Sequence, residues 1–455
     1  MADKPIPTAK GAPFVGLARP MIANAPEFLL RLATEYGGLV EFTLFGRRFL
    51  LISDPDAIRE VLVTRADSFP KAARDAEILG RFLGQGLVSN NDVAFHKQQR
   101  KLMQPAFHPR RIQNYAGVMV DYTQRLMDGW QAGATRDLSA EMMELTMFIV
   151  SKSLYGAGMD AMADEAHTVG AAIETLQGVS NADFQAPVLW PEWLPTGRNR
   201  RRKAARAVLY GVIEELIAAR RATAVNGQVQ DTGDLLSMLL LARYDDGRFM
   251  SDRQARDELV TLFVAGHETT SNALTWSWYL LAQHPPVEAQ LHAELDAVLG
   301  GRAPTLADLP DLPFTLQIIK ETLRLYPPAW VLNTRVAAED TAVGEYAVPR
   351  GRQIFIAPYV MHRLPRYWDN PTRFDPQRFT AEREKEIARY VYLPFGAGPR
   401  VCIGNAFALM EAHLIVATIA QRWRFELLPT QTIELQPQIT LSNKSGMQMR
   451  LMPRA

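Results

Sequence analysis

The stretch Phe395-Gly396-Ala397-Gly398-Pro399-Arg400-Val401-Cys402-Ile403-Gly404 contains the only cysteine of this 455-residue chain. A single cysteine can form neither an intramolecular disulfide nor a zinc site that needs several cysteines. The three glycines let the backbone pass close to a flat or bulky group. Arg400, the loop N–H groups and a helix that should start just beyond the sulfur would favour a Cys402 thiolate, the form that binds metals. A buried structural cysteine is the alternative.

A second informative segment lies inside the longest helical pattern of the chain. Ser251 to Gln254 form a capping-box start, and the pattern ends before Pro285. Such a helix is roughly 50 Å long. Gly266 in its middle costs about 1 kcal/mol relative to alanine. We explain this glycine by close approach to a flat ligand and a local opening of the helix, with Glu268 and Thr269 supplying a carboxylate and a hydroxyl for proton delivery.

A zinc site at the same place is excluded by the spacing. His267-Glu268 begins like the zinc-protease motif His-Glu-x-x-His. That motif needs a second histidine at position 271, which is Ser271 here.

Together these segments resemble the cytochrome P450 family. Residues 395–404 match its haem-binding loop, Phe-x-x-Gly-x-Arg-x-Cys-x-Gly, at every fixed position, and residues 265–270 match its oxygen-activation motif. The resemblance implies a mainly α fold with a small β-region, in one haem domain over residues 1–455. Haem b would lie between the helix at 251–283 and the cysteine loop, with Cys402 ligating the iron. The implied cofactor contacts also include Phe395, Arg400, Gly404 and Ala265.

Basic residues outside the loop are candidates for the two haem propionates. His96 and Arg100 are one helical turn apart on one face, which by itself is also typical of a solvated helix. The resemblance implies a propionate role for both, and for Arg335. It also implies a buried structural network of Glu321, Arg324 and Arg378, although the family usually has glutamate where Gln377 stands.

The substrate pocket is the least specific part of the prediction. The resemblance implies that a glycine-rich loop before residue 92 covers the pocket, which makes Phe82 and Leu87 lining candidates. Ala329, Trp330 and Val331 would pass the haem edge and face the substrate. Residues 442–447 would form a turn into the pocket. Ordinary core packing is the alternative for the loop residues.

The small β-region should begin with a hairpin at residues 39–53, where two apolar runs flank Gly46. Asp54-Pro55 then predicts a helix start, with aspartate as the N-cap and proline at the first position.

The net charge and the distribution of charged residues along the chain exclude several classes of function. A net charge of +1 gives no signature of nucleic-acid binding. Residues 1–20 are charged and lack an apolar segment, so we expect neither a signal peptide nor a membrane anchor. The longest stretch without acidic or basic residues, 269–287, contains polar residues and two prolines, which is unfavourable for a membrane span. We therefore expect a cytoplasmic monomer.

The resemblance implies monooxygenation: O2 and two electrons would hydroxylate a lipophilic molecule such as a long-chain fatty acid, terpenoid, carotenoid or steroid. The bacterial fatty-acid and carotenoid hydroxylase branch is the most similar. The chain has no Rossmann-type or flavin-binding extension, so electrons would come from a separate ferredoxin or flavodoxin and an NAD(P)H-dependent reductase. A basic patch could bind this partner: Lys97, Lys101, Arg110, Arg111 and Arg389. The alternatives are a peroxygenase or isomerase, and a non-enzymatic haem sensor or electron carrier with His267 as a second ligand.

Overall fold

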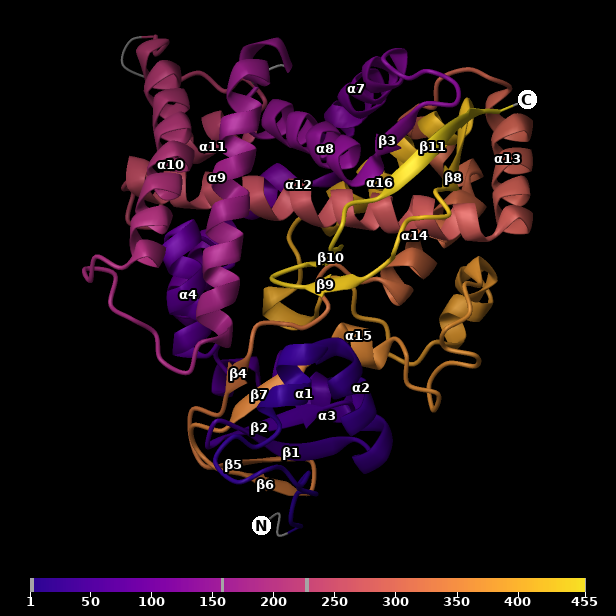
Figure 1. Cartoon of the computed structure of the whole chain (residues 1–455). Helices are drawn as coiled ribbons and strands as arrows, with labels where there is room; N and C mark the ends of the chain where they lie inside the picture. The colour runs from indigo at the N-terminus through magenta and orange to yellow at the C-terminus, as the bar shows by residue number, and fades with distance from the viewer. Residues whose placement is uncertain (1–3, 157–158, 226–228, 455) are drawn as a thin grey trace.

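Two hydrophobic cores organise the molecule, one among the helices and a smaller one around the β-rich part near the N-terminus. The structure is a computed structural model and describes residues 4–156, 159–225 and 229–454. Most of the helices occupy the upper part of Figure 1, and the main sheet lies in the lower part with the short helices near the N-terminus. The expected mainly α fold with a small β-region is confirmed.

Helix α12 (Asp252–Gln283) runs through the helical part of the molecule (Figure 1). The Ser251 hydroxyl accepts a hydrogen bond from the backbone N–H of Gln254, as the capping box predicts, at 3.2 Å. The helix ends at Gln283, just before the proline pair that begins α13 (Pro285–Leu299). Most residues of α12 are buried, because other helices cover it on several sides.

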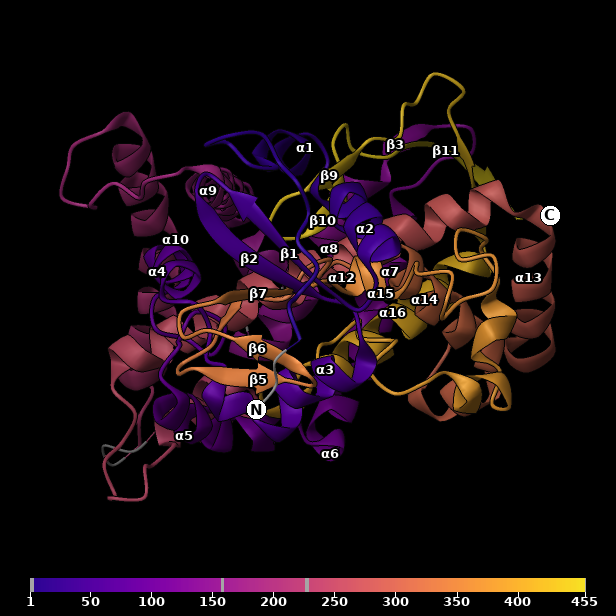
Figure 2. The ribbon, with the colours of Figure 1, turned by 90° about the horizontal axis from the view of Figure 1, so that it is seen from below.

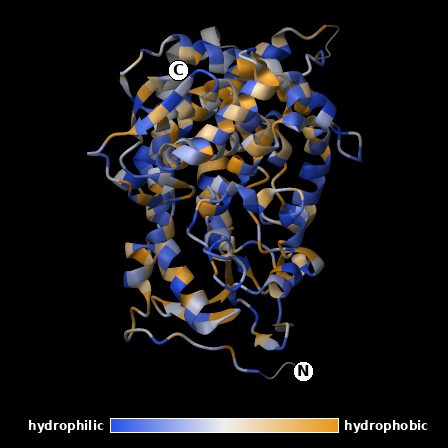
Figure 3. Cartoon of the chain, turned by 90° about the vertical axis from the view of Figure 1, so that its right-hand side faces the viewer, coloured by the Kyte–Doolittle hydropathy of each residue, from blue (hydrophilic) through white to orange (hydrophobic). Residues whose placement is uncertain are grey.

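Helices α8, α10, α14 and α16 pack directly against α12. Hydrophobic and hydrophilic residues alternate along most helices (Figure 3), so that each presents an apolar face to the core. Within the residues that the structure describes, none of the helices has the length and apolar character needed to cross a bilayer. The remaining larger helices and those named here have these bounds: α2 Ala25–Tyr36, α4 Ala73–Leu83, α5 Val93–Met103, α7 Ala116–Asp128, α8 Leu138–Tyr155, α9 Met159–Gln185, α10 Gly197–Ala222, α11 Leu235–Leu241, α14 Pro313–Leu325 and α16 Asn405–Ala420.

The main sheet has the strand order β1-β2-β7-β4. Strands β1 (Leu39–Leu44) and β2 (Arg47–Ile52) form the expected antiparallel hairpin. Phe45 and Gly46 between them both have positive φ, at 49° and 76°, as a two-residue type I′ turn requires. Strand β2 pairs in parallel with β7 (Gln353–Ile356), which also pairs with β4 (Arg335–Val336); Figure 2 shows β1, β2 and β7 side by side.

Smaller elements complete the fold. Asp54 caps helix α3 (Pro55–Arg59) through the N–H of Ala57 at 2.9 Å, which confirms the predicted helix start. Of three small sheets, one joins distant segments, β3 with β11 and β8, and the other two are short pairs of neighbouring strands. The strands of these sheets are β3 Thr135–Asp137, β11 Gln448–Pro453 and β8 Trp423–Leu427; β9 Leu435–Pro437 and β10 Leu441–Asn443; and β5 Thr341–Val343 and β6 Tyr346–Val348. The remaining short helices are α1 Ala18–Ala23, α6 Pro109–Ile112 and α15 Pro358–Met361.

A buried ion-pair network joins α14 to the turn Pro376–Phe379. The guanidinium of Arg324 donates two hydrogen bonds to the carboxylate of Glu321, at 2.7 and 2.8 Å, and both side chains are fully buried. Arg324 also donates to the carbonyls of His362 and Pro371, each at 2.7 Å. Arg378 lies 3.4 Å from Glu321. The residues singled out in the sequence therefore do meet in one place.

Removing Arg324 would leave the Glu321 carboxylate buried without its main partner. We expect Arg324→Ala to lower the free energy of unfolding by about 3–5 kcal/mol, measured by urea denaturation. Arg221→Ala is the control, because it breaks an ion pair with Asp252 in which both side chains are exposed, and should change stability little. Equal losses in the two variants would contradict the structural role of this network.

Candidate functional site

The cysteine loop is a tight turn followed directly by a helix. The N–H of Cys402 donates to the carbonyl of Phe395 at 2.9 Å, which closes the loop before α16 begins at Asn405. Gly398 has φ +70°, and a Cβ there would overlap the backbone carbonyl of Leu62. The loop therefore needs glycine at position 398 for both its conformation and its close contact with the neighbouring segment.

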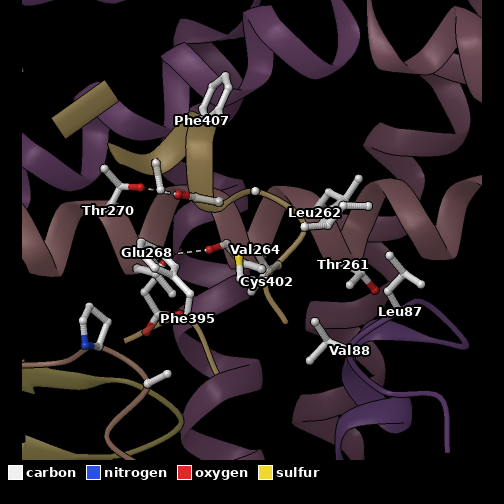
Figure 4. A pocket seen from close by; sticks show the side chains of 18 of the residues that line it. Leu87, Val88, Thr261, Leu262, Val264, Glu268, Thr270, Phe395, Cys402 and Phe407 are labelled. Carbon is white, nitrogen blue, oxygen red and sulfur yellow. Dashed lines mark hydrogen bonds between the residues drawn. The ribbon is translucent and has the colours of Figure 1, made fainter. Parts of the chain in front are cut away.

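The sulfur of Cys402 faces an internal cavity of about 390 Å³ that lies between the cysteine loop and α12. Figure 4 shows Cys402 on one side of this space and Glu268 and Thr270 of α12 near it. Burial raises the pKa of the Cys402 thiol, while the N–H of Gly404 and the guanidinium of Arg100 act in the opposite direction. A cationic metal at the sulfur would supply the stabilisation that a free thiolate lacks here.

Most of the cavity wall is apolar. Four of the five residues predicted for a substrate pocket line it, namely Phe82, Leu87, Ala329 and Val331. Further apolar side chains come from α4, the loop after it, α8, α12 and the segment before β4: Leu79, Leu83, Val88, Val150, Leu154, Leu262, Val264 and Leu332. Such a wall suits a lipophilic molecule.

Trp330 was predicted to face the substrate, and this prediction is wrong. Its ring is buried in the β-side core, and its indole N–H donates to the carbonyl of Gln438 at 2.9 Å. In an extended segment, neighbouring side chains point to opposite sides. Ala329 and Val331 therefore line the cavity while Trp330 points away from it.

The expected turn at 442–447 is also misplaced. Ser442 pairs within the small β9–β10 sheet, and Ile439 and Thr440 reach the cavity instead.

The middle of α12 contributes Ala265, Gly266, Glu268 and Thr269 to the cavity wall. The helix is continuous here, so the predicted local opening is not present. The hydroxyl of Thr269 donates to the carbonyl of Ala265 at 2.7 Å. A Cβ at Gly266 would lie 3.2 Å from a methyl group of Val150, so this glycine also serves the close packing of α8 against α12.

Glu268 is buried and bound by two polar side chains. Its carboxylate accepts hydrogen bonds from the amide of Gln177 and from the hydroxyl of Thr440, the latter at 2.5 Å. Burial raises the pKa of Glu268 to about 7, against the effect of these two hydrogen bonds. The carboxyl group can therefore hold a proton near neutral pH and release it with a small change of environment.

His267 does not line the cavity. It is buried, and its Nδ1 lies 2.7 Å from the carbonyl of Phe263 in the same helix. Burial lowers the pKa of His267 to about 4. In the described part of the chain, no group of three or more histidine, cysteine or acidic side chains is arranged to hold a metal ion.

Basic side chains gather at the edge of the cavity next to the cysteine loop. His96, Arg100, Arg335 and Arg400 all line it, as predicted. Arg100 donates to the carbonyl of Val401 at 2.7 Å, and Arg400 to the carbonyl of Asn90 at 2.6 Å.

The structure adds Lys71 to this basic cluster, which is Lys71, His96, Arg100, Arg335 and Arg400. Lys71 is buried and donates to the carbonyl of Val88. Burial and the neighbouring arginines Arg400 and Arg335 lower the pKa of Lys71 well below its usual value. No sequence pattern predicts this position for Lys71, because a lone lysine before a helix is typical of a surface position.

No carboxylate forms an ion pair with the basic cluster in the part of the chain that the structure describes. Asp75 acts on Lys71, and Asp67 and Asp92 act on Arg400, only from a distance. Nε of Arg335 and Nη2 of Arg400 are buried without a hydrogen-bond partner. Burial lowers the pKa of Arg335 and of Arg400 to about 10 each. Buried unpaired cations are costly, so this arrangement fits an anionic ligand with more than one negative group.

Comparison with known proteins agrees with this geometry. The family model described as "Cytochrome P450" matches residues 6–449. Cyclooctatin synthase of Streptomyces melanosporofaciens is 40% identical over 437 residues, covering 95% of this chain and 92% of that protein. Cyclooctat-9-en-7-ol 5-monooxygenase of the same organism is 38% identical, covering 94% and 91%. The crystal structure of the cytochrome P450DA heme domain has a TM-score of 0.88 at 28% identity, covering 99% and 98%.

A fold of this kind with a cysteine loop below a long helix defines a haem enzyme of the oxidoreductase class. The chain belongs to the cytochrome P450 family and is a P450 monooxygenase. Members of this class use a substrate, O2 and redox partners.

The close contact at Gly398 yields a prediction about cofactor loading. Gly398→Ala should displace the cysteine loop, and we expect a large loss of the haem-bound fraction, read from the spectrum of the reduced, CO-treated protein. Gly351→Ala is the matched control. Its φ is +78°, but a Cβ there meets no atom within 4 Å, so it carries the backbone strain without the clash. Full haem loading in Gly398→Ala would show that the loop tolerates the displacement.

Proposed function

We propose that this enzyme is a haem-thiolate monooxygenase that hydroxylates a terpenoid. One observation carries the proposal: the chain's only cysteine, a basic cluster without ion-pair partners and the Glu268–Thr269 pair all face one cavity with an apolar wall. A thiolate suits haem iron, the basic cluster suits two propionates, and the apolar wall suits a lipophilic substrate.

The cofactor in this proposal is haem b. Cys402 would ligate its iron, and Phe395, Gly404 and Ala265 would contact the ring. When bound, haem would supply the reductive activation of O2. The propionates would receive hydrogen bonds from Arg100, Arg335 and Arg400; Arg335 and Arg400 each have a buried N–H group without a partner. His96 would donate an N–H to a propionate; without the cofactor, burial and the surrounding cations lower its pKa to about 3.

Glu268 and Thr269 would move protons to the reaction site. The pKa of Glu268 near 7 means that its carboxyl group can both take up and give a proton at neutral pH. The hydroxyl of Thr269 can turn from the carbonyl of Ala265 toward the cavity, since a hydroxyl is both donor and acceptor. Gly266 keeps this wall of the cavity free of a side chain.

The substrate class rests on the cavity wall and the relatives. A wall of leucine, valine, alanine and phenylalanine binds hydrocarbon through buried apolar area. The name of one relative describes hydroxylation of an unsaturated alcohol, cyclooctat-9-en-7-ol. We therefore favour a terpenoid over the fatty-acid, carotenoid and steroid classes.

Electrons would come from a separate ferredoxin or flavodoxin and an NAD(P)H-dependent reductase. The proposed basic patch for this partner is weaker than the sequence suggested. Lys97, Lys101 and Arg111 form ion pairs with Asp67, Asp245 and Asp231, which leaves Arg110 and Arg389 as its remaining predicted members. A cytoplasmic location and a monomeric state stay predictions from the sequence.

A peroxygenase or an isomerase is the second enzymatic candidate. The presence of both Glu268 and Thr269 on the cavity wall favours O2 chemistry over these, because peroxide-driven turnover and isomerisation have less need of delivered protons. The electron-carrier reading needs a second axial ligand, and His267 does not face the cavity.

The substrate class is tested by titrating the ferric protein with matched panels of cyclic terpenoids and fatty acids. A ligand that displaces water from the ferric iron changes the iron from low to high spin. This change moves the Soret band. We expect this shift with terpenoids at concentrations where fatty acids give little or none. The reverse preference would contradict the terpenoid assignment while leaving the monooxygenase class in place.

Proton delivery is tested by Thr269→Ala, measured as product formed per NADPH consumed with a surrogate redox partner. We expect the ratio to fall roughly tenfold or more, since electrons are then lost to water or peroxide. Thr275→Ala is the control, because its hydroxyl donates to the Ser271 carbonyl in the same helix but does not reach the cavity. An unchanged ratio in Thr269→Ala would exclude this role.

A further inference from the structure

One polar cluster interrupts the apolar part of the cavity wall, away from the basic cluster. It consists of Gln177 from α9, Glu268 from α12 and Thr440 from the segment before β10. Figure 4 shows Glu268 on the side of α12 that faces the pocket. Gln177 and Thr440 each donate to one oxygen of the Glu268 carboxylate. Three segments far apart in the chain are thus joined at the cavity.

Three other hydroxyl groups on the cavity wall donate to backbone carbonyls of their own helices. The hydroxyl of Ser153 donates to the carbonyl of Ile149 at 2.8 Å, and that of Thr270 to the carbonyl of Gly266 at 3.1 Å. Thr269 is bonded in the same way to its own helix. The donor hydrogen of each of these groups is therefore already in use in this conformation.

Thr440 is also fully engaged. Its hydroxyl donates to Glu268 and accepts a hydrogen bond from the amide of Asn272 at 3.1 Å. The cluster is therefore anchored firmly on the Thr440 side by the fold.

Gln177 is different, because half of its amide group is unused. One N–H donates to Glu268, and in the ionised form of Glu268, which can only accept, this hydrogen bond fixes the amide nitrogen toward the carboxylate. The amide oxygen and the second N–H have no hydrogen-bond partner among the residues that the structure describes. The side chain is only half-buried and lies on the cavity wall. One acceptor and one donor are thus held side by side in an otherwise apolar space.

We propose that the Gln177 amide recognises a hydroxyl group already present on the substrate. The inference rests on the proposed terpenoid hydroxylation and names the substrate more closely, as an oxygenated terpenoid. A hydroxyl group both donates and accepts, so it can donate to the amide oxygen and accept from the second N–H. The Glu268 carboxylate holds the amide in the orientation that this requires.

This arrangement has two consequences for the reaction. Holding one oxygen of the substrate at α9 fixes which carbon reaches the iron side of the cavity, so Gln177 is a specificity-determining residue. The substrate must also come from an earlier step that installs oxygen on the carbon skeleton, such as a prior hydroxylation or a cyclisation ended by water.

The experiment compares two ligands that differ only in a hydroxyl group, cedrol and its parent hydrocarbon cedrane. Their Kd values for the ferric holoenzyme are measured from the spin shift of the haem, without turnover. We expect the wild type to bind cedrol about tenfold more tightly than cedrane, because the amide is left unpaired by the hydrocarbon. Gln177→Leu should remove this preference by weakening cedrol binding, with cedrane binding unchanged or improved.

Two matched variants separate the amide from its surroundings. Thr440→Val removes the other donor to Glu268 but keeps the Gln177 amide, and Ser153→Ala removes a satisfied hydroxyl from the same wall. Both should retain the preference for cedrol. Equal loss of the preference in Thr440→Val and Gln177→Leu would assign recognition to the Glu268 carboxyl group and overturn the proposal.

The outcomes also distinguish this inference from the proposed function. Tight binding of both ligands with no preference in the wild type would overturn the role of Gln177 and leave terpenoid hydroxylation standing. A spin shift with neither ligand, in protein that shows a normal reduced, CO-treated spectrum, would count against a terpenoid substrate and against the anchor together.

Discussion

The accumulation of positive charge beside the cysteine loop is the constraint on which the rest of this structure depends. Lys71, His96, Arg335 and Arg400 come from four distant parts of the chain, yet all face one cavity. The loss of hydration opposes the charged forms of all four groups, and repulsion from neighbouring cations adds to it at Lys71, His96 and Arg335, as their lowered pKa values indicate. A ligand that carries two negative groups would make the electrostatic energy of this basic cluster favourable instead of unfavourable. Cofactor binding and folding are therefore coupled in this protein, since the ligand stabilises only the folded arrangement.

The same cavity shows how one helix can serve several purposes. Helix α12 forms a wall of the site through Ala265, Gly266 and Thr269, while its buried faces hold the helical core together. The closeness of Gly266 to Val150 shows that the glycine has a packing role as well as a possible role toward a ligand. A substitution there would change the position of α8 and the shape of the site together. This double use explains why a helix-destabilising residue can stand in the middle of the longest helix.

Short sequence patterns predict much of the fold. They predict the site only in part. The cap at Ser251, the hairpin turn at Gly46 and the start at Asp54 depend on neighbours within a few residues, so short patterns predict them. Lys71 and Gln177 have no such pattern, because only the packing of distant segments brings them to the cavity. Trp330 was misplaced for a related reason: an aromatic residue in an extended segment fits either side, and the sequence does not say which side is the core.

The parallel pairing of β2 with β7 has a consequence for how the chain is made. Phe49 to Ile52 meet partners about 300 residues further along, which at 5–20 residues per second takes roughly 15–60 s to synthesise. During that time, the apolar β1–β2 hairpin has one edge without its partner strand. Such an edge can pair with other chains. The charged Arg47 and Arg48 at the exposed start of β2 would discourage that pairing until β7 leaves the ribosome.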